Sequence, residues 1–198
     1  MTNYKIFCLH HLPLIERKKY LENKKEEFNF NFEYVETHQP GTSEFNNQYR
    51  INDAELSVTL KILDIFKQIK KEKIDYCFIF EDDILIEFDL IPFFEQIIEQ
   101  SENIDLVFWG GTSNWIVNNP LPKKIVYDGY KKSRCGHGMM FTKETCIRIL
   151  NNYDYTFDKQ FDLQINNLIN RLKLNCAWTS PYVKQKTFEK LEKSSIRP

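Results

Sequence analysis

The sequence has no surplus of charge of either sign, and this excludes several classes of protein. Its 27 Lys and Arg residues nearly balance its 28 Asp and Glu residues, which leaves a formal net charge of -1. Proteins that bind nucleic acid or anionic membranes through general electrostatic attraction carry a basic surplus or a basic stripe. We therefore expect no nucleic-acid partner.

Long apolar runs and a cysteine framework are also missing. No stretch of about 18 apolar residues occurs, so no transmembrane segment is expected. The five cysteines are scattered and odd in number, and no Cys-x-x-Cys is present. This pattern predicts buried, reduced thiols. The apolar run Ile6–Leu9 is too short for a secretory signal. Together these features predict a cytoplasmic protein.

Glycine and proline are scarce, whereas aromatic residues are abundant. With 6 Gly and 7 Pro in 198 residues, collagen-like and low-complexity architectures are excluded. Aromatic residues make up 15% of the chain and hydrophobic residues 42%, which excludes intrinsic disorder. A chain of this length can bury a sizeable core without disulfides or structural metals. We expect a single domain that spans residues 1–198.

Apolar runs and helical periodicities alternate along the chain. Continuous apolar runs indicate buried strands, and apolar residues three or four positions apart indicate helices. The expected strands are 4–9, 32–35, 76–80, 84–86, 106–109, the end of 135–141, and 176–178. The expected helices are 14–21, 53–71, 91–100, 143–150 and 158–171, with Asn52 and Thr142 as N-caps. This alternation predicts an α/β domain with a mainly parallel central sheet flanked by helices.

Three consecutive carboxylates, Glu81-Asp82-Asp83, follow the apolar run Tyr76–Phe80. Carboxylates at the end of a buried strand repel one another and lose part of their hydration, and a bound cation would offset both costs. In open α/β sheets, ligands bind beyond the carboxyl ends of the strands. Oxygen ligands suit Mg²⁺ or Mn²⁺, which commonly bridge a carboxylate to ligand phosphates. The buried strand favours such a metal site over the alternative, an acidic turn that faces solvent.

The segment Ile79-Phe80-Glu81-Asp82-Asp83-Ile84-Leu85-Ile86 resembles the Leu-Glu-Asp-Asp-Val signature of glycosyltransferase family 25. This family includes the bacterial lipooligosaccharide galactosyltransferases and the collagen galactosyltransferases. Further segments resemble family motifs in the same order: Phe7-Cys8-Leu9, Glu16-Arg17, Ala54-Glu55-Leu56, Leu106 to Gly110, Gly138 to Leu150, Phe161-Asp162, and Pro181 with Gln185. The chain departs from the family at Lys61-Ile62, where the family has Ser-His.

The resemblance implies a GT-A-like domain that transfers a sugar with inversion at the anomeric carbon. The expected donor is a nucleotide-sugar, in particular a UDP-sugar, and the expected cofactor is Mn²⁺ or Mg²⁺. The expected acceptor is a hydroxyl of a glycan or of a protein-linked sugar, as in lipopolysaccharide biosynthesis. The alternative is a catalytically inactive GT-A-like domain that binds a glycan or a partner protein. A third interpretation, a metal-dependent phosphohydrolase, lacks a second evident His/Asp cluster for a two-metal site.

The same resemblance implies roles for residues on the donor side. Asp83 is the expected first metal ligand. Asp82 would bind either the metal or the donor, and Glu81 would contact the donor ribose or support that contact. Leu9 and His10, at the end of the first strand, would border the nucleobase, and Gln185 would orient the diphosphate or the metal.

On the acceptor side, Asp162 is the expected base that takes the proton of the attacking hydroxyl. Its alternative role is a helix N-terminal charge, and Asp158 competes with it for either role. Trp115 is the candidate platform for an acceptor sugar. His137, between two glycines, would approach the acceptor or the metal, and a hydrated loop histidine is the alternative.

Overall fold

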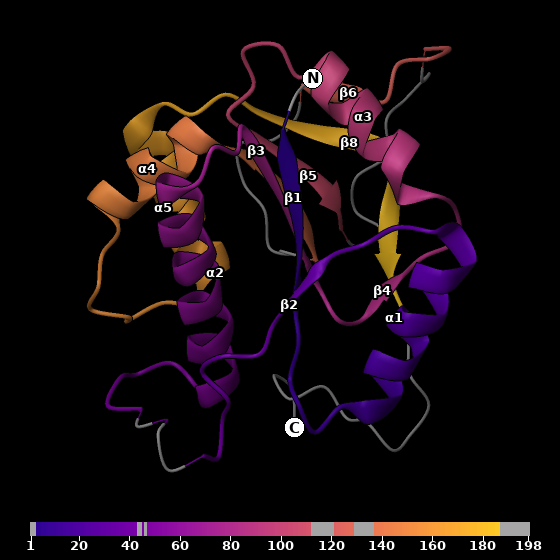
Figure 1. Cartoon of the computed structure of the whole chain (residues 1–198). Helices are drawn as coiled ribbons and strands as arrows, with labels where there is room; N and C mark the ends of the chain where they lie inside the picture. The colour runs from indigo at the N-terminus through magenta and orange to yellow at the C-terminus, as the bar shows by residue number, and fades with distance from the viewer. Residues whose placement is uncertain (1–2, 43–44, 46, 112–120, 129–136, 187–198) are drawn as a thin grey trace.

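Eight strands form one sheet in the part of the chain that the computed structural model describes, residues 3–42, 45, 47–111, 121–128 and 137–186 (Figure 1). The strands are β1 (Tyr4–Leu9), β2 (Glu33–Val35), β3 (Tyr76–Glu81), β4 (Ile84–Leu85), β5 (Leu106–Gly110), β6 (Val126–Asp128), β7 (Gly138–Thr142) and β8 (Cys176–Gln185). The helices are α1 (Ile15–Phe28), α2 (Asp53–Lys71), α3 (Leu90–Gln100), α4 (Lys143–Asn152) and α5 (Phe161–Leu172).

The sheet is mixed, and most of its strands point the same way. Their order is β2-β1-β3-β7-β5-β8-β4, and β6 pairs with β8. β1 is parallel to β2 and β3, and β5 is parallel to β8. β7 lies between β3 and β5 and is antiparallel to both, while β4 and β6 are antiparallel to β8. The predicted α/β domain with a mostly parallel sheet is confirmed, with β7 as an antiparallel strand at its centre.

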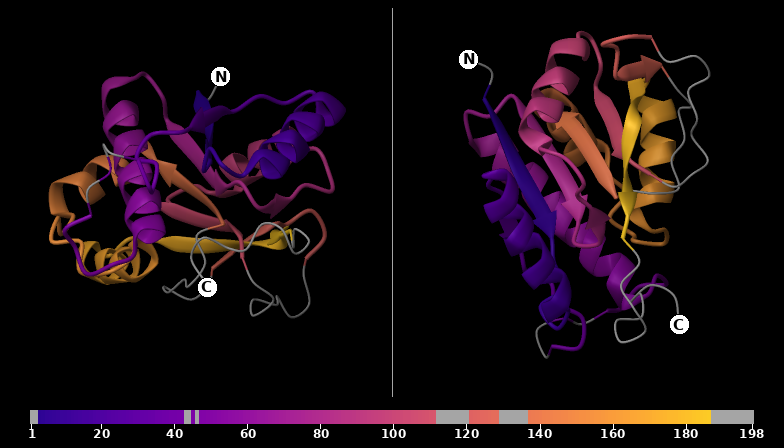
Figure 2. Two further views of the ribbon diagram at one scale, coloured as in Figure 1. Left: turned by 90° about the horizontal axis from the view of Figure 1, so that it is seen from below. Right: turned by 90° about the vertical axis from the view of Figure 1, so that its right-hand side faces the viewer.

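Helices cover both faces of the sheet, and each face has its own apolar core. On one face α2, α4 and α5 pack against alternate strand residues such as Phe7 and Ile79. On the other face α1 and α3 pack against the strand residues that alternate with these, such as Cys8 and Phe80. Figure 2 shows the strands between these two helix layers. Burial on both faces explains why β1 and β3 are uninterrupted apolar runs in the sequence.

Several expected element boundaries are confirmed, and others shift for identifiable reasons. The Asn52 and Thr142 side chains cap α2 and α4 as predicted, each accepting a hydrogen bond from the backbone three residues on. The last helix begins at Phe161 rather than at residue 158, because Gln160 precedes it with an extended backbone (φ -58°, ψ 158°) that a helix cannot contain. β8 continues well past residue 178 because it pairs with β6 up to Thr179, with β5 at Val183, and with β4 at Lys184 and Gln185.

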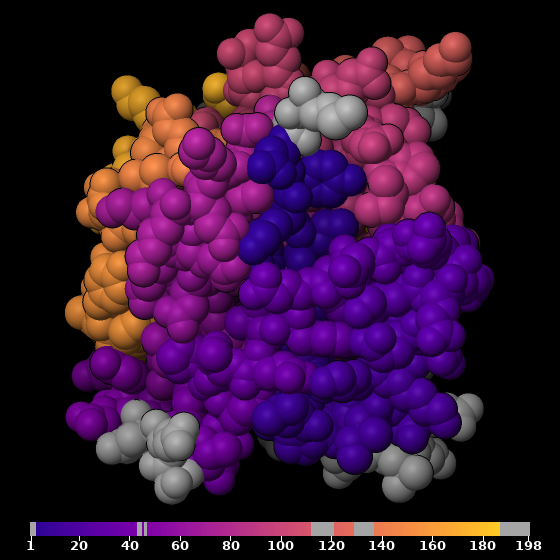
Figure 3. Space-filling model, viewed as in Figure 1, coloured from indigo at the N-terminus to yellow at the C-terminus, as the bar shows by residue number. Residues whose placement is uncertain are grey.

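No described helix combines the length and the apolarity needed to cross a membrane. Four of the five cysteines lie in the described part of the chain, where they are buried free thiols, as expected; Cys135 lies outside it. The first third of the chain, indigo to violet in Figure 3, covers the lower part of the face in view. This region includes α1, which supplies one side chain to the site described next.

Candidate metal centre

Strand pairing places the acidic cluster where three strands meet. β1 and β3 lie in register, so Leu9 is paired with Glu81 at their carboxyl ends. β7 starts at the same point in the opposite direction, with Gly138 paired with Phe80. The Glu81 amide donates a hydrogen bond to the His137 carbonyl over 3.2 Å. The antiparallel strand therefore brings His137 beside the acidic residues, although more than fifty positions separate them in the sequence.

Two glycines permit this close approach. A Cβ atom on Gly138 would lie 2.7 Å from the ring of Trp109, and one on Gly110 would lie 2.6 Å from the Gly138 nitrogen. Real Cβ atoms do not approach other atoms so closely, so β5, β7 and the buried indole fit together only with glycine at both positions. Trp109 is fully buried, which assigns it to the core. The glycine next to His137 thus has a packing function that positions the histidine.

Glu81, Asp83 and His137 form a group that could hold a metal ion. Each contributes one potential ligand atom, and these atoms all lie within 4.8 Å of one another. Asp83 and His137 are buried, and Glu81 is partly exposed, so the group is accessible from the side of Glu81. The Asp83 Oδ1 atom is buried and has no hydrogen-bond partner among the described residues. A buried carboxylate oxygen without a donor is costly, and a cation at this place would satisfy it.

The other oxygen of Asp83 is held by the protein. Gln185, the last residue of β8, donates from Nε2 to Asp83 Oδ2 over 2.6 Å. Arg17 Nη1 lies 3.4 Å from the same oxygen. Gln185 reaches Asp83 because β8 pairs with β4, so that Gln185 lies opposite Ile84. Asp83 is therefore oriented through one oxygen while its second oxygen is available to a ligand.

The electrostatics of Asp83 also favour a bound cation. Burial, with the nearby charge of Glu81, raises the pKa of Asp83 from 3.8 to about 6, although Gln185, Arg17 and His137 act in the opposite direction. Two carboxylates this close repel each other, and burial penalises the ionised form. A divalent cation would remove both penalties. The donor set of two carboxylates and an imidazole fits a divalent metal.

Asp82 has a different environment from its two acidic neighbours. Its Oδ1 accepts a hydrogen bond from Arg17 Nη1 over 2.7 Å. Its Oδ2 accepts bonds from His10 Nδ1 over 2.8 Å and from the His11 amide over 3.1 Å. Burial raises the pKa of Asp82, but these partners outweigh it and leave the pKa below its ordinary value. Both oxygens are thus already used within the protein, and Asp82 is not part of the metal-binding group.

The end of β1 is joined to α2 and to the loop after β2 by buried polar contacts. The His10 carbonyl accepts hydrogen bonds from Lys61 Nζ over 2.7 Å and from Gln39 Nε2 over 3.2 Å. The imidazole of His10 is fully buried and bonded to Asp82. Lys61 is itself buried, and this burial lowers its pKa from 10.5 to about 8, although the charge of Asp82 acts in the opposite direction. These groups form a network that fixes the strand end.

The structure places the remaining predicted residues in several regions. Leu9 is buried in the core beside the strand end, and the side chain of His10 lies inside the network rather than at an open surface. Asp162 lies in the first turn of α5, next to the buried Phe161. Asp158 lies in the segment before α5, not in the helix as expected. Trp115 lies outside the described residues.

Sequence reasoning missed the contacts of Arg17, Lys61 and Gln39. The only signal for Lys61 is its spacing, because Ser57, Lys61 and Ile65 lie four residues apart on a buried face of α2. Arg17 is the one charged residue of α1 that is buried, along with Leu21. Neither position reveals its partner in the sequence, since His10 and Asp82 lie far away in the chain, just beyond the ends of β1 and β3.

No protein-family model and no curated protein matches this sequence. In structure, the chain is similar to a glycosyltransferase involved in the glycosylation of the major capsid of PBCV-1. The two share 10% identity with a TM-score of 0.47, and the match covers 87% of this chain and 77% of that chain. It is similar to a Desulfovibrio desulfuricans protein described as a nucleotide-diphospho-sugar transferase (10% identity, TM-score 0.47, coverage 90% and 80%). It is also similar to A197 from STIV (13% identity, TM-score 0.44, coverage 99% and 100%). At these identities and TM-scores the likeness assigns no family and no activity to this chain, and membership of glycosyltransferase family 25 is not supported.

Proposed function

We propose that this protein is a metal-dependent glycosyltransferase that uses a nucleotide-sugar donor. The observation that carries the proposal is the buried group of Glu81, Asp83 and His137, with an Asp83 oxygen that has no donor among the described residues. This group lies at the carboxyl ends of β1 and β3, the edge at which α/β sheets bind ligands. The motif around Glu81 resembles that of a glycosyltransferase family, which favours a nucleoside diphosphate as the ligand.

In this proposal Asp83, Glu81 and His137 hold a divalent cation. The cation supplies Lewis-acid stabilisation of the leaving diphosphate. Gln185 orients Asp83 through the bond to Oδ2, so that Oδ1 points to the ligand. Asp82 does not bind the cation but positions the end of β1, which would border the nucleotide. This division of roles differs from the expectation that Asp82 binds either the metal or the donor.

The donor set favours Mn²⁺ over Mg²⁺ as the cation. Mg²⁺ prefers oxygen ligands and retains several waters, whereas an imidazole ligand suits a transition metal. His137 would supply that nitrogen. UDP is the proposed nucleotide, on the resemblance of the acidic motif alone. The acceptor would be a sugar hydroxyl.

The proposed base for the acceptor hydroxyl is Asp162. It lies in the first turn of α5, where the helix dipole favours the ionised carboxylate. Asp162→Asn should lower the rate of sugar transfer about a hundred- to ten-thousandfold while donor binding persists. If transfer by this variant equals that of the wild type, Asp162 has only a structural role at the helix terminus.

The decisive experiment measures binding of Mn²⁺ and UDP to the wild type and to Asp83→Asn. Calorimetry of UDP binding should show dependence on Mn²⁺ in the wild type, and the variant should lose that dependence because the carboxylate no longer offsets the charge of the cation. Asp128→Asn, an exposed change of the same chemistry on β6, is the matched control and should behave as wild type.

The possible outcomes separate the proposal from its alternative. Transfer of sugar from a UDP-sugar, or its hydrolysis, would establish the enzyme. Metal-dependent nucleotide binding without turnover on any acceptor would instead favour an inactive binding domain. If neither Mn²⁺ nor Mg²⁺ alters the stability of the wild type, the metal centre is wrong, because a cation that binds the folded state must raise its stability.

A further inference from the structure

A second candidate site lies away from the metal centre, between α5 and the segment that precedes it. Here the structure contains a cavity with a volume of about 190 Å³. None of its lining residues belongs to the metal-binding group or to the network around Asp82. The cavity therefore needs an explanation of its own.

One wall of the cavity is a single face of α5. Gln164, Asn167, Leu168 and Arg171 line it, and their spacing of three and four residues places them on one side of the helix. Gln164 and Leu168 are buried and form the floor, with one amide and one apolar surface. Asn167 and Arg171 lie at the exposed margin.

The opposite wall is the segment before α5, which contributes Asp154, Thr156, Asp158 and Lys159. The backbone carbonyl of Asp154 accepts a hydrogen bond from Gln164 Nε2 over 3.1 Å, which ties the two walls together. The Asp154 side chain accepts one from the Thr156 amide over 3.1 Å. The cavity is thus built by defined contacts.

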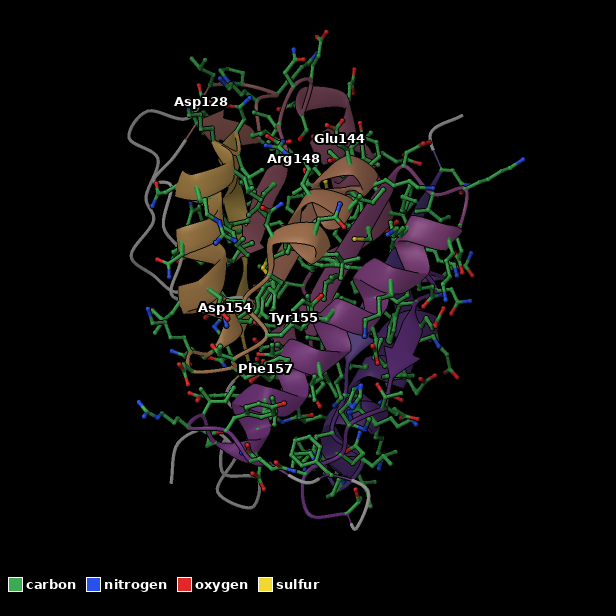
Figure 4. The ribbon with its side chains drawn as sticks, turned by 90° about the vertical axis from the view of Figure 1, so that its left-hand side faces the viewer. Asp128, Glu144, Arg148, Asp154, Tyr155 and Phe157 are labelled. Atoms are coloured by element: carbon green, nitrogen blue, oxygen red, sulfur yellow. The ribbon has the colours of Figure 1, made fainter. Side chains whose placement is uncertain are left out.

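Tyr155, whose chain neighbours Asp154 and Thr156 line the cavity, belongs to an aromatic cluster with Phe157 and Tyr49. Tyr155 is 49% exposed, and its ring lies 6.1 Å from that of the buried Phe157. Tyr49, which is 44% exposed, packs against Phe157 with a distance of 4.8 Å between the ring centroids. Figure 4 shows Asp154 on the α5 side of the segment and Tyr155 on the α2 side, on the same face of the molecule. The left-handed backbone of Phe157 (φ 50°) is unusual for a bulky residue, and such conformations cluster at functional sites.

The charges of the cavity select a class of ligand. Two carboxylates, Asp154 and Asp158, face two cations, Lys159 and Arg171, so the cavity has no net charge. Because both signs are present in equal number, the cavity has no surplus of charge that would favour a simple anion or a simple cation. A neutral ligand with several hydroxyl groups could use the polar atoms that these side chains do not already spend on the protein as hydrogen-bond partners. The exposed tyrosine rings beside them offer apolar faces for stacking.

We propose that this cavity and the rings of Tyr155 and Tyr49 form a binding site for a neutral carbohydrate. Its volume lies below the roughly 300–1,000 Å³ of sites for drug-sized ligands, which limits the cavity itself to a single sugar ring. Further sugar units would extend over the tyrosines. Binding here requires neither a metal nor a nucleotide. If the protein is the proposed glycosyltransferase, this site would bind the acceptor glycan, and only that role rests on the proposed function.

The test uses the ¹⁵N-labelled full chain, without metal or nucleotide, and a panel of neutral sugars. The panel contains methyl glycosides of glucose, galactose, mannose and N-acetylglucosamine, together with lactose and maltose, at millimolar concentrations. At least one sugar should shift amide resonances of residues 153–159 and 164–171. Tyr155→Ala and Asn167→Ala should each weaken that binding about tenfold, the equivalent of one stacking contact or hydrogen bond. Leu163→Ala, an exposed change on α5 outside the cavity, should leave it unchanged.

Each outcome either supports or overturns the proposal. If no sugar shifts these amides, if the shifts lie elsewhere, or if Tyr155→Ala and Asn167→Ala bind as the wild type does, no carbohydrate site exists here. If glycine or inorganic phosphate, added as probes, shifts the same amides while the sugars do not, the cavity binds a charged ligand and the proposal is wrong. Asp83→Asn should retain sugar binding. Sugar binding in a protein that binds no metal or nucleotide would overturn the proposed function and leave this site standing.

Discussion

Asp82 and Asp83 are adjacent in the chain and both are buried, yet the protein lowers the pKa of one and raises that of the other. Asp82 accepts hydrogen bonds from Arg17, from His10 and from the His11 amide, and its pKa is lowered despite burial. Asp83 has one bonded oxygen and one buried oxygen without a donor among the described residues, and its pKa is raised to about 6. Asp82 thus stabilises the fold, whereas the burial of an unbonded Asp83 oxygen beside Glu81 costs stability.

The largest change in stability should come from substitution of Asp82, the carboxylate that has hydrogen bonds at both oxygens. Asp82→Asn should lower the unfolding free energy at pH 7 by about 3–5 kcal/mol, because Arg17 would remain buried without its closest counter-charge. Urea unfolding at matched temperature measures the change. Since the pKa of Asp82 is lowered in the folded state, its contribution is present above pH 3.8 and is lost as the pH falls through the folded pKa. A change below about 1 kcal/mol, similar to that of Asp128→Asn, would contradict the structural role of Asp82.

Lys61 belongs to the same network and gives a test in the alkaline range. Its pKa falls from 10.5 to about 8 in the folded protein, so the unfolded chain binds more protons between these two values. The wild type should therefore gain up to about 3 kcal/mol of unfolding free energy relative to Lys61→Met as the pH rises from about 8 to 10.5. Lys70→Met, an exposed change on the same helix, should show no such gain. Parallel stability curves for wild type and Lys61→Met would show that Lys61 is solvated.

Asp83→Asn should change the unfolding free energy in the opposite direction from Asp82→Asn. Without metal at pH 7, it should raise the unfolding free energy by about 1–3 kcal/mol, because the neutral amide removes the cost of an ionised, buried Asp83 beside Glu81. In the wild type this cost appears as the pH rises from 3.8 through about 6. The variant should also lose the stabilisation by Mn²⁺ that thermal unfolding detects in the wild type. Destabilisation by Asp83→Asn without metal would remove the contrast between the two residues.

The smallest effect should come from Gln185. Gln185→Leu removes the bond that orients Asp83, so it should weaken Mn²⁺ binding about tenfold, as is usual for residues that position a metal ligand. Titration of Mn²⁺ by calorimetry measures this change, and Gln96→Leu on the exposed side of α3 is the control. If both variants bind Mn²⁺ equally well, Asp83 needs no positioning from β8.

The order of strands and helices follows closely from the sequence, because local physical rules determine it. Continuous apolar runs mark β1 and β3, which must be buried on both faces, and Asn52 marks the start of α2 through its side-chain cap. The boundary of α5 could not be predicted in this way. The expected helix starts at residue 158, whereas α5 starts at Phe161, after the extended Gln160. The Gln160 side chain makes no cap hydrogen bond, so no capping residue marks this start in the sequence.

By itself the sequence determined that a row of carboxylates follows a buried strand, and it predicted a metal site at the point where the structure groups Glu81 and Asp83 with His137. Only the tertiary structure decided which carboxylate is available to a ligand. Asp82 and Asp83 lie in the turn between β3 and β4, and their partners come from α1, from β8 and from the residues next to β1 and β7, far away in the sequence. Burial, charge and hydrogen bonding at one atom depend on all of these segments together, so no local pattern could distinguish the two residues.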